Sequence, residues 1–339
     1  MSQPVNESKT DKVGLGLVGL GWWGGVLADG VAAGQDAALV SCFARNPENR
    51  STFAAARGIR AADSFEQMLD DDEVEGILLA TAHESHADLI EQAAGAGKHV
   101  FVEKPFTLTV ADGKRAIAAA EQARVVLQVG HNKRRQTANR RLKQLIDDGE
   151  MGTVIMIETH QNSPLALGFG PDYWRNSRDE SPLGSMTSLG VHMIDTMHYL
   201  LGPVARVSTF TNTVLDQPPI DHVTMLVLEF EAGQLGYLGT SFVVPPTVSV
   251  TVRGTGGTAW NEEDGAKLWR QAPAGLGRTS EPVEPNDTVA GELSEFADAI
   301  RGGPAPETGG AEGLEVIAVM AAAQASSESG QAVAVADHR

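Results

Sequence analysis

The sequence contains one cysteine, Cys42, among its 339 residues. An intrachain disulfide therefore cannot form, and a reducing compartment, the cytoplasm, is the expected location. No apolar run approaches the roughly 20 residues that a membrane-spanning helix needs. The first 12 residues are polar and lack the apolar core of a secretory signal. We therefore expect a soluble intracellular protein that has no contact with a membrane.

Positively charged residues are also scarce. The chain has 26 lysine and arginine residues against 44 aspartate and glutamate residues, which gives a formal net charge of -18 at pH 7. Nucleic acid and anionic membrane surfaces would be repelled by this charge, so neither is an expected partner. The hydrophobic fraction of 42% is enough for a substantial core, and the length suits two domains.

A glycine-rich turn interrupts the apolar stretch of residues 13–31. Gly19, Gly21 and Gly24 have the G-x-G-x-x-G spacing, with a predicted strand before them and a predicted helix from Trp23 after them. In that context Gly19 makes the tight turn, Gly21 lets the backbone approach a pyrophosphate, and Gly24 permits close packing. The phosphates would lie at the helix N-terminus. The pattern predicts a dinucleotide site, and the alternative is a purely structural glycine turn.

Strands and helices alternate through the first part of the chain. The predicted strands are residues 13–18, 37–43, 76–80, 98–102 and 125–129, and the predicted helices are residues 23–31, 47–57, 64–69, 87–96 and 109–123. Such alternation indicates right-handed crossovers in a doubly wound parallel sheet. We therefore predict an α/β fold that begins with a Rossmann domain over residues 1–130.

The pattern changes after residue 130. The sequence predicts a basic amphipathic helix at 132–148, a strand at 154–161, a helix at 189–201, and successive strands at 204–215, 222–231, 234–244 and 247–254. Long strands in succession favour an antiparallel sheet. A surface loop is expected at 266–286, and helices at 289–301 and 313–329 end the chain. We therefore predict an α+β domain with a mostly antiparallel open sheet over residues 131–339.

The end of the second predicted strand carries Arg45, and no carboxylate is next to it. An acidic residue at this place would bind the ribose 2'-hydroxyl of NAD(H). An arginine suits the 2'-phosphate of NADP(H), because its planar fork makes charge-assisted hydrogen bonds to phosphate oxygens. The sequence therefore favours NADP(H). The alternative is that Arg45 faces solvent and selects neither cofactor.

Glu103, Lys104 and Pro105 follow the predicted strand at 98–102. Open α/β sheets bind ligands at the carboxyl ends of their strands, so Lys104 would project toward the nicotinamide. Pro105 would hold the turn, and a cis bond is one way to do so. Taken alone, a lysine after a strand is more often a surface residue than a catalytic one.

His192, Asp195 and His198 are spaced three residues apart on a predicted helix and so lie near one face. A histidine suits proton transfer from a hydroxyl, and an ammonium such as that of Lys104 would stabilise an alkoxide. Asp195 would orient the imidazole or bind a substrate hydroxyl. The alternatives are a packed helix with hydrogen-bonded histidines and a metal site, and the spacing disfavours a metal site.

Several motifs together resemble the glucose-fructose oxidoreductase, inositol dehydrogenase and MocA-like family. They are GLGWWG near the N-terminus, GKHVFVEKP at 97–105, GSMTSLGVHMIDTMHYLLGPV at 184–204, and ELSEFADAIRGG near the end. The resemblance covers nearly the whole chain. It implies NAD(P)-dependent oxidation or reduction of sugars, cyclitols and related polyols, and a homodimer or homotetramer formed through the broad sheet. It also implies that Lys104 is catalytic and that His192 and Asp195 match the family's histidine and aspartate.

The sequence departs from this family at two places. Ser188 occupies the position, four residues before the histidine, where inositol dehydrogenases usually carry an aspartate. Thr81, Ala82 and His83 replace the usual Thr-Pro-Asn, ahead of a histidine that corresponds to His86. Without the aspartate, either His192 works with Lys104 alone or the reaction differs. His86 would line the cofactor pocket, or it packs at a helix start.

The predicted site thus has three parts. The catalytic residues are Lys104, His192 and Asp195; the cofactor-binding residues are Gly19, Gly21, Trp23, Gly24, Arg45, His86, Glu103 and Lys104; the substrate-binding residues are Tyr173, Trp174, Arg175 and Ser188. No metal is expected. The alternative for Trp174 is that it anchors its loop on the core. The alternatives to a dehydrogenase are a lyase or glycosidase that uses bound NAD transiently, and a non-catalytic NAD(P)-binding sensor.

Overall fold

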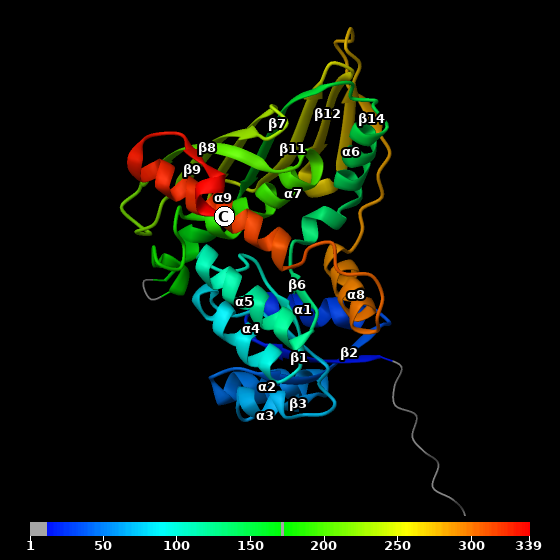
Figure 1. Ribbon diagram of the computed structural model, residues 1–339, viewed down its shortest axis with the longest axis vertical. Helices are drawn as coiled ribbons and strands as arrows, with labels where there is room; N and C mark the ends of the chain where they lie inside the picture. Colours follow the sequence, from blue (N-terminus) through cyan, green and yellow to red (C-terminus); the bar gives the residue numbers. More distant parts are fainter. Residues whose placement is uncertain (1–11, 171–172) are drawn as a thin grey trace, which may run out of the picture.

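The structure is a computed structural model, and it describes residues 12–170 and 173–339 (Figure 1). It consists of two sheets, one above the other along the long axis of the molecule. The lower sheet belongs to the blue and cyan part of the chain, and the upper sheet to the green and yellow part. The expectation for residues 1–11 lies outside the described residues.

The first sheet has six strands in the order β3-β2-β1-β4-β5-β6, and every neighbouring pair is parallel. The strands are β1 (Val13–Val18), β2 (Ala37–Phe43), β3 (Arg60–Ala61), β4 (Gly76–Leu79), β5 (His99–Val102) and β6 (Leu127–Val129). The intervening helices are α1 (Trp22–Ala33), α2 (Pro47–Arg57), α3 (Phe65–Leu69), α4 (His86–Gly95) and α5 (Val110–Ala123). The predicted Rossmann sheet is confirmed, and only the two-residue strand β3 was not predicted.

Local sequence explains where these elements begin. Every residue of β1 is buried, as its continuous apolar run predicts. Helix α2 begins with Pro47 behind Asn46, whose side chain accepts hydrogen bonds from two free backbone N–H groups. Thr109 caps α5 in the same way. Cys42 is buried in β2, as expected.

The strand order reverses beside β1, which lies between β2 and β4. The connections that leave β1 and β4 at their carboxyl ends therefore run to opposite sides of the sheet, and a crevice opens between them. This crevice places the glycine turn after β1 next to the segments that follow β4 and β5.

The second sheet has nine strands in the order β14-β13-β12-β11-β7-β10-β9-β8-β15. The strands are β7 (Val154–Asn162), β8 (Val204–Asn212), β9 (Val223–Phe230), β10 (Leu235–Ser241), β11 (Thr247–Gly254), β12 (Gly257–Glu262), β13 (Lys267–Gln271), β14 (Thr279–Glu281) and β15 (Val333–Ala334). Only β7 and β10 pair in parallel. The predicted mostly antiparallel sheet is therefore confirmed.

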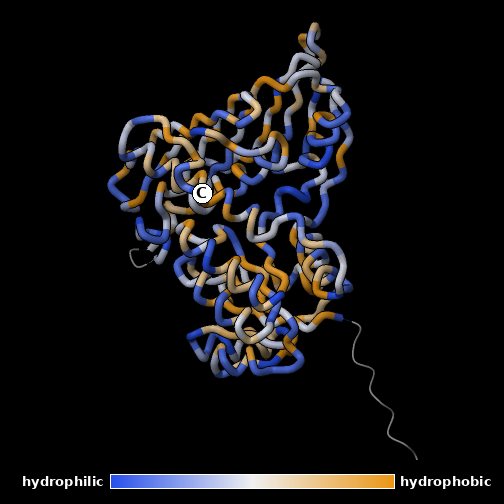
Figure 2. Tube along the Cα trace, in the orientation of Figure 1, coloured by the Kyte–Doolittle hydropathy of each residue, from blue (hydrophilic) through white to orange (hydrophobic). Residues whose placement is uncertain are grey.

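One face of the second sheet is covered by helices α6 (Thr137–Asp147), α7 (Val191–Leu201) and α9 (Gly310–Ser329), whose apolar residues share a core with it. Figure 2 shows α6 as a mostly hydrophilic segment, and its few buried residues are those that face the sheet. The opposite face of the sheet carries exposed large apolar side chains, namely Ile155, Phe210, Met225, Val227 and Leu235. This open face is available for a partner of similar breadth.

Two predictions for the second part are wrong in detail. The single basic helix at 132–148 is a 3-10 turn, η2 (Asn132–Arg135), followed by α6, because Gln136 leaves helical geometry to bond Asp264 and Asn261. The expected loop at 266–286 contains β13 and β14, which extend the sheet through β12. Their mixed polarity suits a half-exposed sheet edge, which composition alone does not distinguish from a loop.

The part of the chain that follows β14 returns to the first sheet. Helix α8 (Thr288–Ile300) packs on α1, where a Cβ on Gly30 would lie 2.9 Å from Val289 Cγ1. In α9, Ile317 joins the core of the first sheet and Val316 that of the second. These helices join the two parts, and the division of the chain at residue 130 stays a prediction.

No helix within the described ranges combines the length and the apolar run that crossing a bilayer requires.

Candidate functional site

A cleft of about 1030 Å³ lies between the carboxyl ends of the first sheet and the helical side of the second. From the first part of the chain it is lined by the glycine turn, the segment after β4 and the turn after β5. From the second it is lined by η2, the end of β7 and the segment before α7. The crevice that the strand order predicts is therefore the floor of this cleft.

The three glycines of the first turn have different surroundings. Gly19 has a φ of +94°, and a Cβ there would lie 2.3 Å from the carbonyl oxygen of Ala80. A Cβ on Gly24 would lie 2.1 Å from the carbonyl oxygen of Gly19. A Cβ on Gly21, in contrast, would meet nothing within 4 Å, although Gly21 lines the cleft. The protein itself needs the first and third glycines, and the second leaves space for a ligand.

The N-terminus of α1 suits an anion. Gly21 is its N-cap and supplies no side-chain hydrogen bond, and the first turn contains no acidic residue. Its backbone N–H groups are therefore available to a ligand. Together with the open space at Gly21, this turn fits the pyrophosphate of a dinucleotide.

Replacing Gly21 by aspartate tests this fit. Aspartate is a better N-cap than glycine, and its backbone here is extended, so we expect the unfolding midpoint to stay or rise. The carboxylate would repel a pyrophosphate, and we expect cofactor affinity to fall by about 100-fold or more. Calorimetric titration and thermal unfolding measure both effects. Gly24→Ala is the contrasting variant and should lower the unfolding midpoint, because its Cβ would lie 2.1 Å from the carbonyl oxygen of Gly19. Unchanged cofactor affinity in Gly21→Asp would contradict the assignment.

Lys104 stands at the centre of the cleft. Its Nζ donates a hydrogen bond of 3.1 Å to the carbonyl oxygen of Ser188 and lies 5.5 Å from the ring centroid of Trp23. Burial, with the nearby charges of Arg175 and Lys133, lowers its pKa to about 8 against the opposing effect of the Glu103 and Glu292 carboxylates. Trp23, Lys104 and Ser188, which the sequence placed in one site, are thus brought together.

Glu103 and His86 support the turn that carries Lys104. The Glu103 carboxylate is buried, accepts a hydrogen bond of 3.2 Å from the backbone N of Lys104, and has a pKa raised by burial. His86 is fully buried, and its Nδ1 donates to the carbonyl oxygen of Pro105 at 2.9 Å. The Lys104–Pro105 bond is cis, as the sequence suggested. Glu103 lines the cleft and His86 does not, so contact of His86 with a cofactor stays a prediction.

His192 reaches the cleft from the first turn of α7. Its Nδ1 is buried and has no hydrogen-bond partner, so Nε2 is the nitrogen that the cleft reaches. Burial, followed by the charges of Lys104 and Lys133, holds its pKa well below the ordinary value. The imidazole is therefore neutral at neutral pH. Ser188 lies one turn earlier, in the π-helical turn η5 (Met186–Gly190), and its Oγ is also buried without a partner.

Asp195 is not brought to the cleft. Its side chain is 0% exposed and accepts several hydrogen bonds from Arg134, of which the shortest is 2.8 Å. This buried ion pair ties η2 to α7, and removing one partner of such a pair is strongly destabilising. The predicted contact of Asp195 with His192 or substrate remains untested. Among the described residues, no group of three histidine, cysteine, aspartate or glutamate side chains gathers as a metal site.

Tyr173, Trp174 and Arg175 form one wall of the cleft. The Arg175 guanidinium lies 4.0 Å from the Trp174 ring centroid and donates a hydrogen bond of 2.6 Å to the Tyr173 hydroxyl. The Trp174 ring meets His83 edge-on at 4.8 Å. His83 is in turn held by Glu180, whose carbonyl oxygen accepts from Nδ1 at 2.8 Å. The loop is therefore fastened to the end of β4.

Arg45 is exposed and lies outside the cleft, just beyond the end of β2. Within residues 12–170 and 173–339 it has no carboxylate within 4.0 Å, unlike most arginines of the chain. Arg45 follows β2 and Lys104 follows β5, and these strands lie on opposite sides of β1 in the sheet.

Sequence reasoning missed several polar residues of the cleft, namely Gln161, Asn162, Asp264 and Asn286. Gln161 and Asn162 end β7, so polar residues at the close of a mostly apolar strand were a usable signal. Asp264 has no such signal, because only the tertiary fold brings it to Lys133, with which it forms an ion pair.

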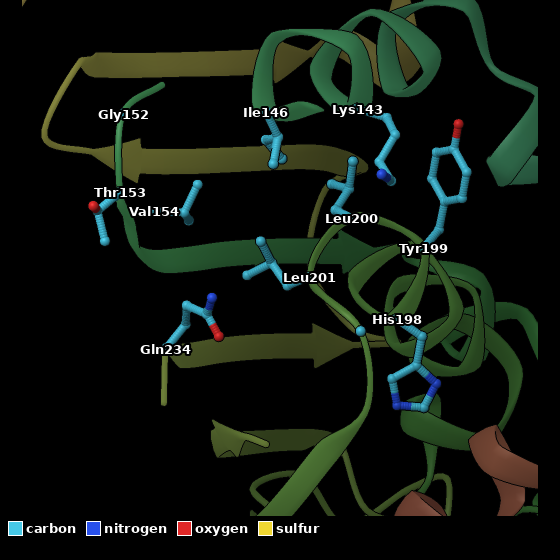
Figure 3. A pocket seen from close by; sticks show the side chains of 11 residues that line it. Lys143, Ile146, Gly152, Thr153, Val154, His198, Tyr199, Leu200, Leu201 and Gln234 are labelled. Atoms are coloured by element: carbon cyan, nitrogen blue, oxygen red, sulfur yellow. The ribbon is translucent and has the colours of Figure 1, made fainter. Parts of the chain in front are cut away.

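A second cavity, of about 580 Å³, lies between α6, the end of α7 and β7 (Figure 3). None of the residues predicted for catalysis, cofactor or substrate lines it. It is therefore separate from the cleft.

Comparisons with known proteins agree with this geometry. A model of the GFO/IDH/MocA oxidoreductase family, NAD-binding Rossmann fold, matches residues 13–131, and a model of the GFO/IDH/MocA C-terminal domain matches residues 139–260. A 1,5-anhydro-D-fructose reductase of Ensifer adhaerens is 26% identical over 88% of this chain and 91% of its own length. An inositol 2-dehydrogenase of Rhizobium meliloti is 28% identical over 92% and 96%.

A solved oxidoreductase structure from Desulfitobacterium hafniense is 31% identical, covers 96% of this chain and 99% of its own, and superposes with a TM-score of 0.92. A levoglucosan dehydrogenase in complex with NADH and L-sorbose, 22% identical, has the same fold with a TM-score of 0.88 over 96% and 99% of the two chains. The two family models, in order, span the first sheet and most of the second, as far as β12. The chain therefore belongs to the GFO/IDH/MocA family of NAD(P)-dependent oxidoreductases.

Proposed function

We propose that this enzyme moves a hydride between NADP(H) or NAD(H) and a secondary alcohol or ketone of a sugar, cyclitol or related polyhydroxylated compound. The observation that carries the proposal is the convergence of the open glycine turn, the Lys104 ammonium and the His192 imidazole on one cleft. The nicotinamide, when bound, supplies the site for hydride transfer. Side chains of the protein accept the proton and stabilise the charge on the substrate oxygen.

In the oxidation direction, Nε2 of His192 accepts the proton of the substrate hydroxyl, while a hydride leaves the carbon that bears this hydroxyl. Lys104 stabilises the negative charge that develops on the substrate oxygen. Both groups are in the protonation state this requires: burial keeps the pKa of His192 low and its ring neutral, and a pKa of about 8 leaves most of Lys104 charged at pH 7. In the reduction direction the same groups return the proton.

The direct test is a screen of sugars, inositols and sugar acids for absorbance change at the reduced-nicotinamide band, with both cofactors. We expect net reduction or oxidation of the cofactor with at least one polyol. Turnover of a glycoside without net cofactor change would instead identify a lyase or glycosidase. Cofactor binding with no turnover across the panel would support a sensor and would contradict the proposal.

We assign the cofactor preference to Arg45. Its exposed guanidinium at the end of β2 is free to make bidentate bonds to a 2'-phosphate. We expect NADP(H) to bind more tightly than NAD(H), and Arg45→Ala to weaken NADP(H) by about tenfold or more while NAD(H) changes little. Titrations of both cofactors check this. Arg124→Ala, at another exposed arginine without an ion pair, is the control, and tighter binding of NAD(H) by the unaltered enzyme would end the assignment.

Tyr173, Trp174, Arg175 and Ser188 are the proposed substrate contacts. The fixed stack of Arg175 on Trp174 offers both an apolar ring and hydrogen-bond donors, which suits the mixed faces of a sugar. Ser188 lines the cleft, and its buried hydroxyl has no protein partner, so a rotation about its Cα–Cβ bond toward the cleft would let it bond to a substrate hydroxyl.

The exposed apolar face of the second sheet is the proposed contact between copies of the chain. Isolated apolar residues are ordinary on a surface, but five on one sheet face indicate burial by a partner. We therefore propose a homodimer or homotetramer, which light scattering can measure. The buried state of the single cysteine agrees with the cytoplasm as the proposed location.

A further inference from the structure

His131 is a buried histidine that the mechanism above does not use. It lies two residues after the end of β6, is 1% exposed, and has no hydrogen-bond partner at either ring nitrogen. Buried polar atoms in proteins nearly always have a partner, and ordered water commonly supplies it. Two orphaned nitrogens on one ring therefore point to a function for the side chain.

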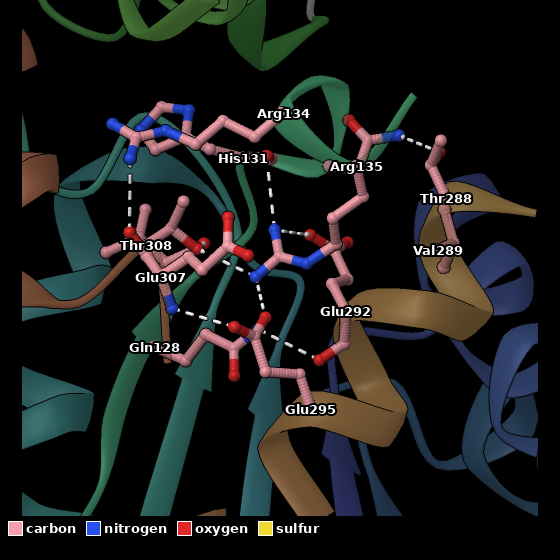
Figure 4. A network of polar contacts seen from close by, with 12 residues as sticks. Gln128, His131, Arg134, Arg135, Thr288, Val289, Glu292, Glu295, Glu307 and Thr308 are labelled. Atoms are coloured by element: carbon pink, nitrogen blue, oxygen red, sulfur yellow. Dashed lines mark hydrogen bonds and ion pairs between the residues drawn. The ribbon is translucent and has the colours of Figure 1, made fainter. Parts of the chain in front are cut away.

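The backbone of His131 is held without help from the ring. Its N–H donates to the carbonyl oxygen of Val129 at 2.8 Å, and its carbonyl oxygen accepts from Arg135 at 3.4 Å (Figure 4). Arg135 is itself anchored by Glu295. The turn after β6 thus keeps its shape through main-chain contacts, and the imidazole is available for another task.

The ring of His131 stands edge-on to that of His192, with 6.5 Å between their centroids and an interplanar angle of 81°. No direct hydrogen bond joins their nitrogens, so a link between the two rings needs a bridging water. The nitrogen of His192 that lies away from the cleft, Nδ1, is likewise buried and unpartnered. Each of these two neighbouring imidazoles therefore has a buried nitrogen that lacks a hydrogen-bond partner.

The tautomer of His192 depends on this bond. For Nε2 to accept a proton from substrate, the hydrogen of the neutral ring must lie on Nδ1, and the partner of Nδ1 decides whether it does. Among the described residues no carboxylate bonds to Nδ1, since Asp195 is engaged by Arg134 and position 188 is a serine. His131 is a neighbouring imidazole with unpartnered nitrogens that can act as acceptor.

We propose that His131 is a positioning residue for His192: through one water it accepts the hydrogen bond of Nδ1–H and so keeps the Nε2 lone pair in the cleft. The inference rests on the proposed function, in which that lone pair takes the hydroxyl proton. His131 suits the role of acceptor because it is neutral. Burial lowers its pKa to about 4, against the attraction of Asp195 and with Arg134, Lys104 and Arg135 also lowering it.

The first test reads the tautomer directly. Nitrogen-15 spectra of histidine-labelled, substrate-free protein distinguish protonated from unprotonated ring nitrogens. We expect His192 to carry its hydrogen on Nδ1 in the unaltered protein, and His131→Phe to give a mixture of tautomers. This result does not depend on finding a substrate. A hydrogen on Nε2 in the unaltered protein, or no change in His131→Phe, would overturn the inference.

The second test is kinetic. His131→Phe keeps an aromatic ring but removes both nitrogens, and we expect kcat to fall by about 10-fold to 100-fold with little change in KM. His131→Gln keeps an acceptor and should retain most of the rate. The alkaline limb of the pH profile should stay in place in both variants, because no charge is removed.

A rescue separates positioning from packing. Residue 188 lies four positions before His192 and so on the same side of the helix. Ser188→Asp, added to His131→Phe, provides a new acceptor and should restore part of the lost kcat. The control for stability is His198→Phe, which removes an imidazole of α7 that also has an unpartnered nitrogen. If the Phe variant loses rate and neither the Gln variant nor the added aspartate restores it, His131 only packs and the inference is wrong.

Discussion

Replacing Lys104 by alanine should lower kcat by about two to four orders of magnitude, while cofactor affinity stays within a few-fold of the original. The reason is that Nζ is a positive group in the cleft close to His192 and supplies the charge that stabilises an alkoxide. Among the described residues, Nζ of Lys104 hydrogen-bonds only to the carbonyl oxygen of Ser188, so removing the side chain breaks no hydrogen bond to a buried carboxylate. Steady-state rates with the substrate found in the screen measure the effect, and a rate near that of the unaltered enzyme would refute the role.

The same residue predicts a pH dependence. A lowered pKa of about 8 means that Lys104 is charged below pH 8 and loses its proton as the pH rises through that value. If the charged form is required, kcat/KM falls tenfold per pH unit above about 8, rather than near the ordinary lysine pKa of about 10.4. Lys104→Arg keeps its charge across this range, so any activity left in that variant should lack the limb. A limb that persists there would assign it to another group.

Replacing His192 by alanine is expected to lower kcat by a similar two to four orders of magnitude, because the hydroxyl proton then has no acceptor in place. His192→Asn fills much of the same volume without a titrating nitrogen and should be equally impaired, which separates proton transfer from packing. The acid limb of the unaltered enzyme should lie well below pH 6.5, since burial and the neighbouring ammonium groups lower the pKa of His192.

A further comparison distinguishes the two roles. Imidazole added to His192→Ala should restore part of the rate if the missing function is proton acceptance, because an imidazole with a pKa of about 6.5 is mostly unprotonated above pH 7. Imidazole should leave Lys104→Ala slow, because its neutral form does not supply the missing positive charge. Full activity of His192→Ala without any addition would show that another group takes the proton.

The elements of the first sheet were predictable because their signals are local. β1 is an unbroken apolar run, α2 has both an asparagine cap and a proline at its start, and the glycines have a fixed spacing. The strands at the edge of the second sheet were harder to predict. β13 and β14 are half exposed and rich in polar residues, so their pairing partners, and not their own composition, make them strands.

Some residues of the site were likewise predictable from local signals, and others were not. Lys104 was predictable because it follows a buried parallel strand, and His192 because it occurs within a helix motif. Asp195 shares that motif, yet its side chain pairs with Arg134 from η2, a contact between segments 61 positions apart in sequence. Helical spacing gives the side of the helix on which a residue lies, and it says nothing about what packs there.

The sequence by itself determined the parallel first sheet with its order of strands and helices apart from β3, the glycine turn and the family, because each depends on neighbours within a few residues or on motifs along the chain. Only the tertiary structure decided which of the candidate side chains face the cleft, which are engaged in ion pairs, and that His131 lies against His192. Those outcomes depend on burial and on distances between remote segments. Both are properties of the packed chain, and they also set the pKa values on which the chemistry depends.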